Sequence, residues 1–222
     1  MLTKEHADYL RTVAALIAVE RPSAVEATEL SNVATLIDAK VDSTKRSNEQ
    51  YAELQAIGKG AAESITEMVA ALECDYDRLD ELKEMQRDYL ADQQNSEEDR
   101  AEPDLSDEEK EELKELREAA GDCESREDAE QRIHENSLSV QVRSSEWHEV
   151  GAEPAPPDEF EILLGTGGPA TRIIGEFNEH GEPTRAQIQA QDWGTPWTDY
   201  RGDTIEQETL LTYCRCFVFS AE

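Results

Sequence analysis

Carboxylates are the reactive groups that this sequence supplies in greatest number, and they crowd into two stretches at helical spacing. The stretch DLSDEEKEELKEL, residues 104–116, has seven acids among thirteen residues, and a second acid-rich run spans residues 75–88. Carboxylates three or four residues apart on a helix lie about 5 to 6 Å from one another, while duplex DNA presents about one phosphate charge per 1.7 Å of its axis. An ordered acidic helix can therefore present a row of negative charge comparable to the phosphates of one strand.

These carboxylates lead to the hypothesis of a decoy that occupies the basic groove of a nucleic-acid-binding protein. The predicted partner-binding residues are Asp75, Asp77, Asp80, Glu81, Glu84, Asp88, Asp104, Asp107, Glu108, Glu111, Glu112, Glu115 and Glu118. Two plainer interpretations stay open: the acids keep the protein soluble, or the middle of the chain is a flexible acidic connector.

The charge map locates the acids in the middle of the chain. The 222 residues include 52 acids and 21 bases, a formal charge of -31. Residues 73–136 hold 26 of the acids and 9 of the bases, a net charge of -17, whereas residues 1–72 carry -4 and residues 137–222 carry -10. This charge repels nucleic acid and anionic lipid. We therefore expect a basic protein as partner, and neither direct nucleic-acid nor membrane binding.

A second candidate surface is aromatic. Trp193, Trp197 and Tyr200 fall together in QDWGTPWTDY, and aromatic side chains combine a large contact area with few torsions to freeze. The competing interpretation is a loop that folds back to close the edge of a sheet.

No other pattern predicts a site. The four histidines are scattered and CRC at 214–216 lacks a second ligand pair, so we expect no metal. GTGGP at 165–169 fits a hairpin turn better than an anion-binding loop, because it lacks the P-loop lysine. We expect no cofactor, no catalytic residue and no enzyme activity.

The elements that would position these residues predict an α+β fold. Residues 1–92 are expected to form a helical region: one helix up to Pro22, a second opened by a capping box at Ser23 and Glu26, and a third capped by Asp42 or Ser43 and stopped by GKG at 58–60. A fourth helix, 61–90, has near-heptad apolar steps, so it either packs on the other helices or forms a homodimer.

The rest of the chain divides into three segments. Residues 93–105 are a predicted linker or hinge, and residues 106–136 an acidic helical segment with capping patterns at Ser106 and Ser125. Residues 137–222 are predicted to form a four-stranded antiparallel β-meander with a covering C-terminal helix from about Thr204.

The four cysteines are too few and too irregularly spaced for a disulfide framework, and no stretch reaches the roughly 20 apolar residues of a membrane span. We therefore expect free thiols and a reducing, cytoplasmic location.

Three blocks of the sequence carry a family resemblance. AAESITEMVAALECDYDRLDELKE, the stretch from FEILLG to QDWGTPWTDY, and LLTYCRCFVF resemble an uncharacterised family of small acidic proteins encoded by tailed phages and prophages of Pseudomonas and related bacteria. The resemblance implies an accessory phage protein that acts in the cytoplasm of a bacterial host, a class that often inhibits host defence nucleases. It implies no catalytic residue.

Charge and resemblance together predict a phage-encoded inhibitor of a host nucleic-acid-binding defence protein, of the anti-CRISPR or anti-restriction type. The alternative is a structural or adaptor protein of the phage life cycle that uses helix 61–90 without nucleic-acid mimicry.

Overall fold

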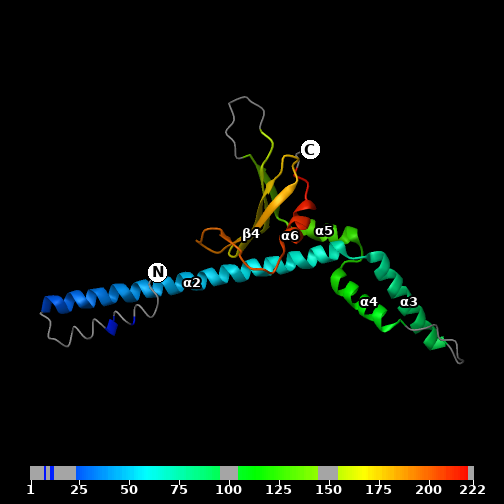
Figure 1. The fold of residues 1–222 in the computed structure, drawn as a ribbon, viewed down its shortest axis with the longest axis horizontal. Helices are drawn as coiled ribbons and strands as arrows, with labels where there is room; N and C mark the ends of the chain where they lie inside the picture. The colour runs from blue at the N-terminus through cyan, green and yellow to red at the C-terminus, as the bar shows by residue number, and fades with distance from the viewer. Residues whose placement is uncertain (1–7, 9–10, 13–23, 96–104, 145–154, 220–222) are drawn as a thin grey trace. The chain divides into compact units, whose positions relative to one another are not determined.

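Helices occupy the first part of the chain and an antiparallel sheet the last part, which confirms the α+β class (Figure 1). The computed structural model describes residues 8, 11–12, 24–95, 105–144 and 155–219. The helices are α2 (Ala24–Glu73), α3 (Tyr76–Asn95), α4 (Asp107–Ala120), α5 (Arg126–Asn136) and α6 (Gln207–Arg215). The strands are β1 (Ser139–Arg143), β2 (Glu159–Gly165), β3 (Ala170–Phe177), β4 (Pro183–Gln191) and β5 (Thr198–Asp199). The chain forms two compact units, Met1–Leu54 and Gln55–Glu222.

The helix α2 is continuous where two helix boundaries were predicted, so both predictions are wrong. Asp42 and Ser43 lie inside it, and so does the GKG sequence. The glycine at 58 serves close packing instead, because a Cβ at this position would lie 2.7 Å from Cβ of Tyr200. Of the predicted first helix, residues 8, 11 and 12 are described and are helical, whereas its other residues and the predicted cap at Ser23 fall outside the described residues.

The predicted helix 61–90 is also wrong, because Cys74 and Asp75 interrupt it. The Asp75 carboxylate accepts a hydrogen bond from the backbone N–H of Arg78 at 3.0 Å and so caps the start of α3. Ile65 and Leu72 lie in the main hydrophobic core. The heptad-like run therefore contributes to cores within one chain and does not offer its apolar side for a homodimer.

Both predicted caps of the middle segment are confirmed. Ser106 accepts from the backbone N–H of Glu109, whose carboxylate accepts from the backbone N–H of Ser106, which completes a capping box. Ser125 likewise accepts from the backbone N–H of Asp128 at the start of α5. The acidic helix α4 ends at Ala120, before Gly121 with a φ of 56°.

The sheet is an antiparallel meander in the order β1-β2-β3-β4-β5, with one strand more than predicted. Its inward face includes Phe160, Ile162, Ile173 and Ile188, which join side chains of α2, α5 and α6 in one cluster. The C-terminal helix α6 therefore shares the covering of this face with two other helices. Tyr213 of α6 is fully buried there and accepts a hydrogen bond from the Asn136 side chain at 3.0 Å.

None of the helices in the described part of the chain is both long and apolar enough to span a membrane. The predicted linker 93–105 begins inside α3, which continues to Asn95, and residues 96–104 lie outside the described ranges.

Candidate functional site: the acidic α3–α4 pair

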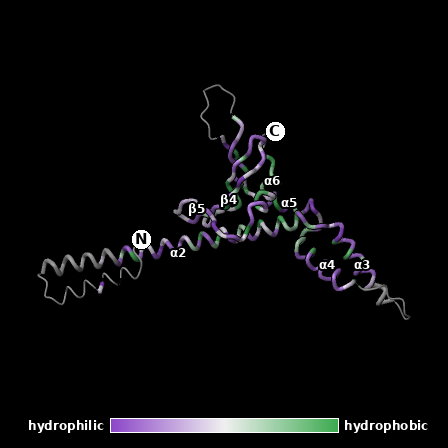
Figure 2. Tube along the Cα trace, in the orientation of Figure 1, coloured by the Kyte–Doolittle hydropathy of each residue, from purple (hydrophilic) through white to green (hydrophobic). Residues whose placement is uncertain are grey.

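Exposed carboxylates form one stripe along α3 and another along α4. The α3 stripe consists of Asp77, Glu81, Glu84 and Asp88, and the α4 stripe of Glu108, Glu111, Glu115 and Glu118. In each stripe the residues follow one another at three- or four-residue steps, so they share one helix face. All eight side chains are exposed, and Figure 2 shows that hydrophilic residues predominate along both helices.

The helices α3 and α4 lie side by side (Figure 1), and a small hydrophobic cluster holds them together. It buries Leu79 and Leu82 of α3 against Leu113 and Ala120 of α4, with Leu105 just before α4. Burying one leucine contributes about 1.5 to 3 kcal/mol relative to leaving it exposed. The packing of these four leucines therefore outweighs the like-charge repulsion along the stripes, where each of six neighbouring pairs costs about 0.2 to 0.5 kcal/mol.

Arg78 connects α3 to α4. It donates from Nε and Nη2 to the two carboxylate oxygens of Glu112 at 3.1 and 2.9 Å, and from Nη1 to Glu81 at 2.7 Å. The guanidinium holds the pKa of Glu112 below its usual value. Arg117 adds a second connection, since it donates to the side-chain oxygen of Gln86 at 2.8 Å. The two hydrogen bonds from Arg78 to Glu112 fix the orientation of both side chains as well as their distance.

Neighbouring cations neutralise only part of the two stripes. Glu84 pairs with Arg87 at 2.9 Å and Glu111 with Lys114 at 2.8 Å. Within the described residues, Asp77, Glu108, Glu115 and Glu118 form no hydrogen bond or ion pair through their carboxylates. Exposed pairs contribute at most about 1 kcal/mol each, so even the paired carboxylates remain available to a competing cationic surface.

The remaining predicted acids do not belong to the stripes. Asp75 caps α3, and Glu112 pairs with Arg78 between the helices. Asp80 lies beside Lys83 at 3.4 Å, and Asp107 is exposed in the first turn of α4. Asp104 falls outside the described residues. The structure thus places four of the predicted carboxylates in a stripe on the exposed face of each helix and assigns structural contacts to others.

The three predicted aromatic contacts do not form a common surface. Tyr200 is buried against α2 at Gly58, and the ring of Trp197 lies 4.2 Å from the guanidinium carbon of Arg172. Trp193 is 77% exposed and lies beside Gly168 of the β2–β3 turn. Because the loop returns to pair β5 with β4, its geometry agrees with the edge-closing interpretation.

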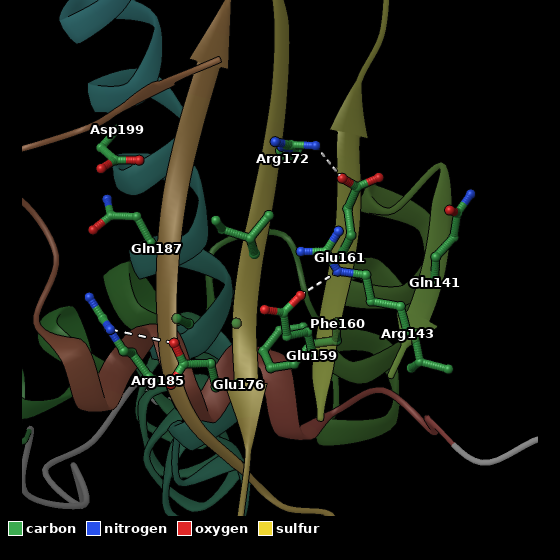
Figure 3. A pocket seen from close by; sticks show the side chains of 14 residues that line it. Gln141, Arg143, Glu159, Phe160, Glu161, Arg172, Glu176, Arg185, Gln187 and Asp199 are labelled. Atoms are coloured by element: carbon green, nitrogen blue, oxygen red, sulfur yellow. Dashed lines mark hydrogen bonds and ion pairs between the residues drawn. The ribbon is translucent and has the colours of Figure 1, made fainter. Parts of the chain in front are cut away.

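The outward face of the sheet carries paired charges that sequence reasoning missed. Three cross-strand pairs join Arg143 to Glu159, Arg172 to Glu161 and Arg185 to Glu176 (Figure 3). They line a shallow hollow of about 430 Å³. Arginines and glutamates at polar positions of the four strands were a signal for this face, but the partners become evident only from the strand register.

Burial makes two of the four cysteines poor nucleophiles. All four are free thiols, and burial raises the pKa of Cys214 and Cys216, which disfavours the nucleophilic thiolate. Among the described residues, no group of three or more metal-binding side chains comes together.

No protein-family model, curated protein or solved structure matches the chain. The choice of candidate site therefore depends on the contacts and charges described above.

Proposed function

We propose that the protein is a phage-encoded inhibitor that binds a host nucleic-acid-binding defence protein of the anti-CRISPR or anti-restriction type. Carboxylates of the α3 and α4 stripes would occupy positions that its basic surface offers to phosphates. The observation that carries the proposal is the presence of two exposed acidic stripes on helices packed together by their own core. The phage origin depends on the sequence resemblance alone.

Order in the acidic segment supports mimicry over a flexible connector. Both α4 and α5 begin with side-chain caps, and Arg78 fixes α4 to α3. A binding surface that is already ordered loses little conformational entropy when a partner docks.

The apolar surface that the adaptor alternative would use is mostly buried. It would use the apolar side of residues 61–90, but Ile65, Leu72 and Leu82 are buried within the chain. Among the side chains of residues 61–89, whose burial the structure describes, Met85 is the one exposed large hydrophobic residue, with 42% of its surface accessible. A single methionine is a weak basis for association through hydrophobic contacts.

A displacement assay tests the proposal. DNA-binding proteins from a bacterial extract are loaded on an immobilised DNA duplex, and the purified chain is added at about 0.1 M salt, where the Debye length is about 10 Å. We expect the chain to displace a subset of these proteins, which mass spectrometry then identifies. Displacement should weaken as the salt concentration rises.

Matched variants distinguish the effect of the α4 stripe from the effect of total charge. One variant replaces four acids of α4 with glutamine: Glu108, Glu111, Glu115 and Glu118. The control replaces four exposed acids in and beside α5: Glu124, Glu127, Glu130 and Glu135. Both variants lose the same charge. If the α4 stripe binds the partner, only the first variant should fail to displace proteins from the DNA. Equal behaviour of the two variants, or displacement that ignores salt, would contradict phosphate mimicry.

A further inference from the structure

We draw no further inference here: the strongest candidate, the shallow hollow on the outward face of the sheet, carries no proposal, because in the described part of the chain Arg143, Arg172 and Arg185 in its wall each pair with a glutamate of a neighbouring strand and nothing there shows what covers this face.

Discussion

Gly58 and Gly60 lie two residues apart in α2, and replacing each with alanine tests how the helix meets the sheet. An alanine in a helix interior is favoured over glycine by about 1 kcal/mol, so Gly60→Ala, with nothing within 4 Å of its new Cβ, should stabilise the protein by about that amount. At Gly58 the new Cβ would lie 2.7 and 2.9 Å from Cβ and Cγ of Tyr200. Relieving such overpacking costs about 1 to 3 kcal/mol.

The free energies of unfolding of the two variants should therefore differ by about 2 kcal/mol, and Gly58→Ala should be less stable than the parent protein. For a unit of this size, this corresponds to a difference of about 4 to 8 °C in melting temperature. Urea and thermal unfolding, followed by circular dichroism, measure both. If Gly58→Ala stabilised the protein as much as Gly60→Ala, the close approach of α2 to Tyr200 would be refuted. Destabilisation by Gly60→Ala would instead support a helix end at the GKG sequence.

Two further predictions concern pH. Arg78 lowers the pKa of Glu112, so this pair stabilises the fold above the unfolded pKa of about 4.3, and its contribution disappears as pH falls through the lower folded value. The destabilisation caused by Arg78→Gln, measured by urea unfolding, should therefore shrink from pH 7 to pH 3. The destabilisation caused by the control Arg117→Gln, which loses a neutral partner, should stay constant. Burial raises the pKa of Tyr213 to about 12, so the free energy of unfolding should fall as pH rises from about 10, where the unfolded tyrosine ionises. The variant Tyr213→Phe should reduce that fall. If the variant leaves the alkaline profile of stability unchanged, Tyr213 is not the group responsible.

Local patterns in the sequence predict the C-terminal sheet well. Strands β2 and β3 coincide with EFEILLG and ATRIIGEF, because period-two alternation and the glycine-rich turns act within a few residues. The same holds for the caps of α4 and α5, in which a serine and an acid three residues later satisfy neighbouring backbone groups.

Features set by distant partners were not predictable in this way. Gly58 has the local signature of a helix end, but its role depends on Tyr200, 142 residues later in the chain. The interruption at Cys74 separates two cores, whereas the near-heptad spacing alone fits one straight helix equally well. At the candidate site, spacing predicts both stripes, but the diversion of Glu112 to Arg78 depends on how α3 and α4 pack.

The small cluster between α3 and α4 also has a consequence for dynamics. Among the residues that the structure describes, five buried ones hold this helix pair, whereas the main cluster comprises twenty. Segments with few apolar contacts open locally at a lower free-energy cost than the global transition. A ligand that binds only the closed form stabilises it in proportion to the logarithm of its concentration. Amide exchange in α3 and α4 would therefore slow when a cationic partner binds, and it would slow further as the concentration of that partner rises.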